Sequence, residues 1–94
     1  MAFCVVLDGK ILVNTVRGTR EELLSSVDID GLLGVNPVIS LIDVMDTECP
    51  AHDVVAYGYR VSDGIVLESL RRTPQEARVS GYDGDLIRVW LRLK

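Results

Sequence analysis

The chain has 94 residues, of which 48% are hydrophobic and 26% charged, and its formal net charge is −4. This length and apolar fraction indicate one folded domain over residues 1–94 and exclude a disordered chain. No charge-free stretch reaches the roughly 18 apolar residues of a membrane helix, and no basic segment leads into an apolar run at the N-terminus. We therefore expect a cytoplasmic protein without a membrane partner.

The first predicted element is a β-hairpin. Phe3 to Leu7 and Ile11 to Val16 are rich in β-branched and aliphatic residues, and Asp8-Gly9 between them suits a tight two-residue turn. The two sides of this hairpin would carry Phe3, Val5, Leu7, Leu12 and Val16 on one side and Cys4, Val6, Ile11 and Val13 on the other. Both sides are apolar, so one needs a cover beyond a single short helix. The cover is either the second half of the chain or another molecule, as a homodimer or a protein partner.

A short helix is predicted next. Thr19 stands three residues before Glu22, which is the spacing of a capping box at a helix start. Aspartates and glycines in residues 28–34 end the helix after about two turns. Residues 37–45 fit two structures, a strand or a helix that begins at Asn36-Pro37, and we favour the strand.

The second half of the chain repeats these features. Val54 to Val61 and Ile65 to Leu70 flank Asp63-Gly64 and predict a second hairpin. Thr73-Pro74-Gln75-Glu76 is again a capping box, with proline at the first helical position. In Asp85 to Leu93, aliphatic residues then alternate with Arg88, Trp90 and Arg92, as expected for a strand. In the second hairpin one side is expected to carry Tyr57, Tyr59, Val61, Val66 and Leu70, with Arg60 interrupting the other.

An internal repeat accounts for this similarity. Residues 11–22 and 65–76, aligned at an offset of 54, agree at four positions, which include Thr19 with Thr73 and Glu22 with Glu76. We expect an α+β fold of two β-β-α-β units, residues 3–46 and 54–94, with a largely antiparallel sheet and short helices on one face. The alternative to duplication is that two hairpins followed by capped helices resemble each other independently.

Cys49 and His52 are the residues considered for catalytic or metal chemistry. A zinc site needs about four ligands, and this segment offers one Cys and His pair. A thiol nucleophile needs a base held by a further group, and no such spacing is present. No glycine-rich phosphate loop occurs either. We expect no catalytic residue, no metal and no cofactor, and we interpret this segment as a polar linker between the two units.

The predicted binding residues are aromatic side chains and arginines of the second half. Residues 1–53 carry nine acidic and three basic side chains, whereas residues 54–94 carry five acidic and seven basic ones. Trp90 lies between Arg88 and Arg92 on one face of the last strand, and Tyr57 and Tyr59 share one side of the second hairpin. Such side chains dominate the energetics of protein interfaces, which favours a protein partner. The alternative is a nucleic-acid-associated regulator that stacks bases on the same edge, which the acidic chain disfavours.

The run Val16-Arg17-Gly18-Thr19-Arg20-Glu21-Glu22, after an Asp-Gly turn and an aliphatic strand, resembles small open reading frames of bacteriophages and prophages. The similar parts are residues 3–24 and, more loosely, 57–93. The resemblance implies a small accessory protein of a phage or its host, a class that includes inhibitors of host defence such as anti-CRISPR proteins. It carries over no functional residue. We therefore expect a non-enzymatic protein-interaction module, an inhibitor or adaptor.

Overall fold

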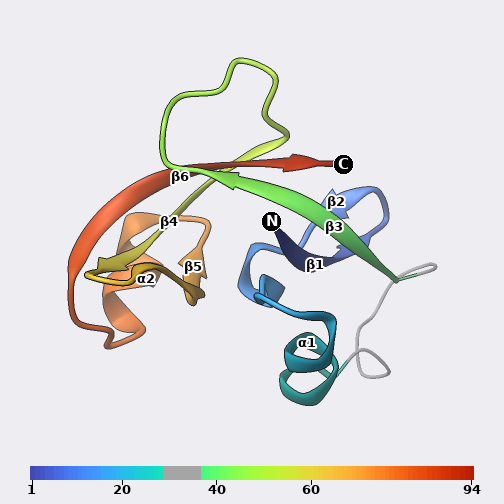
Figure 1. Ribbon diagram of the computed structural model, residues 1–94, viewed down its shortest axis with the longest axis horizontal. Coiled ribbons are helices and arrows are strands. Elements are labelled where there is room, and N and C mark those ends of the chain that lie inside the picture. The colour runs from blue at the N-terminus through green and yellow to red at the C-terminus, as the bar shows by residue number, and fades with distance from the viewer. Residues whose placement is uncertain (29–36) are drawn as a thin grey trace.

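Over the residues that the structure describes, the chain folds into an antiparallel sheet with two short α-helices (Figure 1). The computed structural model describes residues 1–28 and 37–94. Along the chain the elements are β1 (Ala2–Leu7), β2 (Lys10–Ile11), the 3₁₀ turn η1 (Val13–Thr15), α1 (Arg20–Ser26), β3 (Val38–Met45), β4 (Val54–Val61), β5 (Gly64–Arg71), α2 (Pro74–Val79) and β6 (Asp85–Leu93). The expected α+β class is confirmed, and the ambiguous segment 37–45 is a strand, so the helix interpretation is wrong.

The sheet has six strands in the order β2-β1-β3-β6-β4-β5. Its centre is the antiparallel pair β3 and β6, where Val44 lies opposite Leu91 and Met45 opposite Trp90. β1 pairs with the outer edge of β3, and β4 pairs with the outer edge of β6. The first three strands along the sheet therefore come from the first half of the chain and the last three from the second half.

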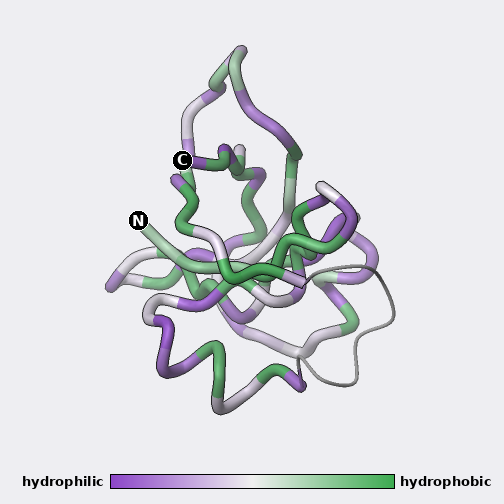
Figure 2. Tube along the Cα trace, turned by 90° about the vertical axis from the view of Figure 1, so that its right-hand side faces the viewer, coloured by the Kyte–Doolittle hydropathy of each residue, from purple (hydrophilic) through white to green (hydrophobic). Residues whose placement is uncertain are grey.

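The sheet curls until its two edges approach each other (Figure 1). Arg72, just after β5, donates a hydrogen bond of 3.5 Å to the carbonyl oxygen of Ile11 in β2. The concave side encloses the main hydrophobic cluster, and green, hydrophobic stretches run through the middle of the trace in Figure 2. Its buried members are Ala2, Cys4, Ile11, Val13, Val16, Ile42, Ala56, Leu70, Val89 and Leu91. The second apolar side of the first hairpin is thus covered by the second half of the same chain.

Both helices pack on the other face of the sheet. In the first half, Leu23 of α1 and Val5 of β1 are fully buried outside the concave cluster. In the second half, Ala77 of α2 is fully buried and packs over the β4–β5 hairpin. Each helix begins as predicted, because the hydroxyl oxygens of Thr19 and Thr73 accept hydrogen bonds from helix amides at 3.1 and 3.2 Å.

The first hairpin differs from the prediction beyond Ile11. β2 ends there, and the chain turns through η1 because Thr15 replaces strand pairing with its own hydrogen bonds. Its Oγ1 accepts from the Val5 amide at 2.9 Å and donates to the Leu12 carbonyl at 2.6 Å. The turn changes the direction of the following side chain, so Val16 joins the concave cluster. The prediction that Val16 shares a side with Val5 is therefore wrong.

The second hairpin has an irregularity at the corresponding place, although β5 continues as a strand through Arg71. The β4–β5 register shifts between Tyr57 and Tyr59. At the shift, Ser69 Oγ accepts from the Tyr59 amide at 2.9 Å and donates to the Val66 carbonyl at 2.6 Å. Leu70 consequently faces the concave cluster, and the prediction that it shares a side with Tyr59 is wrong.

The turn of the second hairpin lies one residue earlier than expected. Val61 pairs with Gly64, so Ser62 and Asp63 form the turn instead of Asp63-Gly64. In the first hairpin Leu7 pairs with Lys10, and the intervening Asp8-Gly9 adopts positive φ angles of 52° and 78°, as the tight turn requires.

Candidate functional site

The predicted binding residues of β6 lie on the outer face of the central strands. Arg88, Trp90 and Arg92 alternate with Val89 and Leu91, which are fully buried in the concave cluster. The predicted alternation of this strand is therefore confirmed. α1 packs on β1, and α2 packs on β4, β5 and β6.

Trp90 is at the centre of a partly apolar patch. It is half-buried and lies opposite Met45 of β3 on one side and opposite Val55 of β4 on the other. Tyr57 and Arg88 form the neighbouring cross-strand pair. We call these five residues, Met45, Val55, Tyr57, Arg88 and Trp90, the Trp90 patch. Three strands, β3, β4 and β6, thus contribute to one surface.

Arg88 holds an exposed positive charge at the rim of the Trp90 patch. Its guanidinium carbon lies 5.5 Å from the centre of the Tyr57 ring, which is a cation–π distance. Within the described parts of the chain, no carboxylate forms an ion pair with it. The ring restrains the side chain, and its charge faces solvent.

Arg92 is in a different electrostatic environment. It donates a hydrogen bond of 2.9 Å to Asp43, its cross-strand partner in β3, and Lys94 lies 3.6 Å from the same carboxylate. The hydrogen bond from Arg92, supported by the charge of Lys94, lowers the pKa of Asp43 below its ordinary value. The positive charge of Arg92 is thus balanced within the sheet.

Tyr59 differs from the other predicted binding residues in its burial. It is only 9% exposed, and α2 packs against the strand that carries it. The structure therefore brings Trp90, Arg88 and Tyr57 together, places Arg92 beside Asp43 and buries Tyr59. Met45 and Val55 were not among the predicted residues, because their proximity to Trp90 depends on pairing between distant strands.

Cys49 and His52 lie in the loop between β3 and β4. The ring nitrogen Nδ1 of His52 hydrogen-bonds the main-chain carbonyl of Cys49, and since a carbonyl only accepts, this nitrogen carries the proton. Across residues 1–28 and 37–94, no three His, Cys, Asp or Glu side chains gather in a way that could hold a metal ion. Cys4 is buried in the concave cluster, and both cysteines are free.

Comparison with known proteins gives no relative. No protein-family model, no curated protein and no solved structure matches the chain. None of the described helices is long and apolar enough to cross a membrane.

Proposed function

We propose that this protein is a non-enzymatic binding module whose contact surface is the Trp90 patch. The observation that carries the proposal is the position of Trp90, half-buried between Met45 and Val55, beside the exposed charge of Arg88. Trp, Tyr, Arg and Met are the residue types enriched at protein interfaces, and Trp, Tyr and Arg dominate binding energies. The patch combines all four types.

The chemistry of the patch specifies its partner. Trp90 and its apolar neighbours suit an apolar or aromatic side chain, and Arg88 suits a carboxylate next to it. A protein fits this pattern better than a nucleic acid, because the nearby cations are already neutralised. Asp43 engages Arg92 and Lys94, and Asp46 binds Arg60 at 2.6 Å. Few positive charges therefore remain beside the Trp90 patch for the many phosphate contacts that nucleic-acid binding requires.

We further propose that the module acts as an inhibitor or adaptor in the cytoplasm, in a phage-related setting. The resemblance of residues 3–24 to small phage reading frames supports this setting, and the two free cysteines suit a reducing compartment.

Duplication of a β-β-α-β unit, giving residues 3–46 and 54–94, is part of the same proposal. The offset of 54 that aligns the sequences also relates side-chain hydrogen bonds. Thr15 bridges Val5 and Leu12 as Ser69 bridges Tyr59 and Val66, in both cases at 2.9 and 2.6 Å. Side-chain hydroxyls that repeat both position and bonding support a common origin over independent resemblance.

Two arginines extend this correspondence. Arg17 donates through Nη1 to the carbonyls of Asn14 and Val16. Arg71 donates through Nη1 to the carbonyls of Glu68 and Leu70, again 54 residues further on. The strand order has the same symmetry. Exchanging β1 with β4, β2 with β5 and β3 with β6, and reading the sheet from its other edge, gives the same order again.

Variants of the Trp90 patch test the binding proposal. Tagged protein is used to capture partners from a lysate of the source organism, and the captured protein is then purified and titrated. Trp90→Ala and Arg88→Glu are each expected to weaken its binding by about 30-fold or more, as hot-spot substitutions do. Arg78→Gln, on the exposed face of α2, is the matched control and should bind like the unmodified protein.

Two results would contradict the binding proposal. If Trp90→Ala and Arg88→Glu keep their fold by circular dichroism and still bind the partner fully, the contact surface lies elsewhere. If the unmodified protein instead binds single-stranded oligonucleotides with an affinity that falls steeply with salt, the nucleic-acid alternative replaces the proposal.

A further inference from the structure

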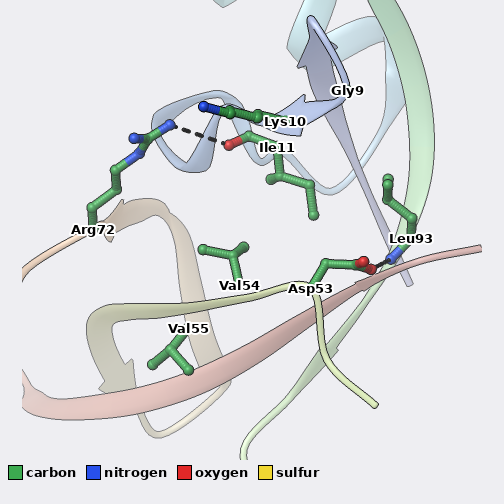
Figure 3. Close-up of a pocket in the computed structure, with 8 residues that line it drawn as sticks. All are labelled: Gly9, Lys10, Ile11, Asp53, Val54, Val55, Arg72 and Leu93. Carbon is green, nitrogen blue, oxygen red and sulfur yellow. Dashed lines mark hydrogen bonds between the residues drawn. The ribbon is translucent and has the colours of Figure 1, made fainter.

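A pocket of about 370 Å³ opens where the two edges of the curled sheet meet (Figure 3). The turn after β1, β2, the start of β4, the end of β6 and the residue after β5 all contribute to its walls. Ile11, Val54 and Leu93 supply apolar surface, and Lys10, Asp53 and Arg72 supply charge. Its volume is within the range of small-molecule sites, about 300–1,000 Å³.

The charges in this pocket are separated. Lys10 and Arg72 reach toward one another on one side, whereas Asp53 lies on the other side next to Leu93 (Figure 3). One carboxylate oxygen of Asp53 is already used, since Oδ2 accepts the Leu93 amide at 2.7 Å. The pocket therefore has a cationic side and, opposite it, a carboxylate that holds the end of β6.

The two cations have spare binding capacity. Within the described residues neither Lys10 nor Arg72 forms an ion pair. The side-chain hydrogen bond of Arg72 to the Ile11 carbonyl is long, at 3.5 Å, which leaves other guanidinium donors for a ligand. Two positive charges directed at one space repel each other. An anion placed between them attracts both and so offsets this repulsion.

The positions of these two cations carry no charge in the other half of the chain. At the offset of 54, Arg72 corresponds to Gly18 and Lys10 corresponds to Gly64. The smaller pocket beside Gly18, about 220 Å³, is lined by Glu22 and Glu68 as acidic groups and by Arg17 as a cation. The same scaffold positions thus hold glycine where the first pocket holds its positive charge.

We propose that this pocket binds a small monocarboxylate with an apolar chain. The carboxylate lies between Lys10 and Arg72, whose planar guanidinium can donate two parallel hydrogen bonds to it. The chain lies on Ile11, Val54 and Leu93. Asp53 selects against phosphate, since a second negative charge would face that carboxylate across a small pocket.

The test is a titration of ¹⁵N-labelled protein with octanoate, followed by amide chemical shifts. Saturable shifts are expected at Gly9, Lys10, Ile11 and Leu93. Octanol, which has the chain without the charge, and inorganic phosphate, which has charge without the chain, should each bind at least tenfold more weakly. Among variants, Lys10→Gln and Arg72→Gln should weaken octanoate binding at least tenfold, whereas Arg72→Lys should lose less because it keeps the charge.

Val55 lines this pocket and also belongs to the Trp90 patch, so controls are needed to tell the two sites apart. Arg78→Gln and Trp90→Ala should bind octanoate as the unmodified protein does, so failure of the binding-module proposal leaves this one intact. Octanoate shifts that do not saturate, or that centre on Trp90, overturn the proposal. Equal binding of octanol or of phosphate also overturns it, because the pocket would then recognise only the chain or only an anion.

Discussion

Two buried hydroxyl groups bind the backbone where the two hairpins are irregular, Thr15 at the turn η1 and Ser69 at the β4–β5 register shift. Thr15 is 3% exposed and Ser69 fully buried, and each both accepts from an amide and donates to a carbonyl. Removing either hydroxyl leaves a buried main-chain amide without that partner, which costs about 1–3 kcal/mol. We expect Thr15→Val and Ser69→Ala to lower the free energy of unfolding by this amount in urea denaturation.

Thr15→Ser is the matched control, because it keeps the hydroxyl and removes a methyl group. It should retain most of the stability that Thr15→Val loses. Equal stability of Thr15→Val and the unmodified protein would show that the hydroxyl bonds do not stabilise the turn.

Cys4 gives a prediction at alkaline pH. Burial raises the pKa of its thiol from 9.0 to about 11, because the low-polarity interior disfavours the thiolate. In the unfolded chain the thiol ionises near pH 9. The buried thiol therefore makes its full contribution to the stability of the folded state below pH 9, and this contribution is lost between pH 9 and 11. The difference corresponds to about 2–3 kcal/mol.

The measurement is urea unfolding across this pH range with the unmodified protein and with Cys4→Ala. The variant loses some packing at every pH, but its stability should fall less between pH 9 and 11. If the stability of the two proteins falls equally between pH 9 and 11, the buried Cys4 thiol is not the cause of the loss. In the folded protein at pH 8, iodoacetamide should modify the half-buried Cys49 well before Cys4.

The pairing of β3 with β6 gives an acid-side prediction. Arg92 and Lys94 lower the pKa of Asp43, so its carboxylate favours the folded state above its unfolded pKa. This stabilisation disappears as the pH falls through the lowered pKa. Asp43→Asn should therefore be less stable at neutral pH and should lose less stability on acidification, as measured by thermal unfolding from pH 7 to 2.5. If Asp43→Asn and the unmodified protein lose the same stability on acidification, the ion pair contributes nothing to the stability of the folded state.

Local chemistry explains which elements could be predicted. Thr19 and Thr73 define helix starts by hydrogen bonds within three residues, and Asp8-Gly9 fits its turn through φ angles alone. The predicted β4 and β6 have the bounds seen in the structure because their composition and alternation are continuous.

Long-range contacts explain what could not be predicted. The side on which Val16 or Leu70 lies depends on a buried hydroxyl bonding to a neighbouring strand. The candidate site shows the same limit. Sequence identified Trp90, Arg88 and Tyr57 by residue type, but the burial of Tyr59 and the ion pair of Arg92 result from tertiary packing.

For the whole molecule, the central fact is that both halves share one core. Cys4 and Ile11 from the first half pack in the same cluster as Leu70 and Leu91 from the second. Neither half can bury this surface alone. We therefore expect a single cooperative unfolding transition, with coincident midpoints from Trp90 fluorescence and from far-ultraviolet circular dichroism.

Leu91→Ala sharpens this prediction. Leu91 is fully buried and lies opposite Val44, where the two halves meet. The substitution should cost about 2–5 kcal/mol and should shift both probes together. Separate midpoints for the two probes would mean that the halves unfold independently.

The connection of the two halves through β3 and β6 also bears on how quickly the chain reaches its native state. Among the described strands, the pairs β1–β2 and β4–β5 join neighbouring segments, whereas Ile42 meets Leu93 across about half the polypeptide. Closing such large loops precedes any gain from the contacts, so refolding should take on the order of milliseconds to seconds, slower than for a helical bundle of equal size.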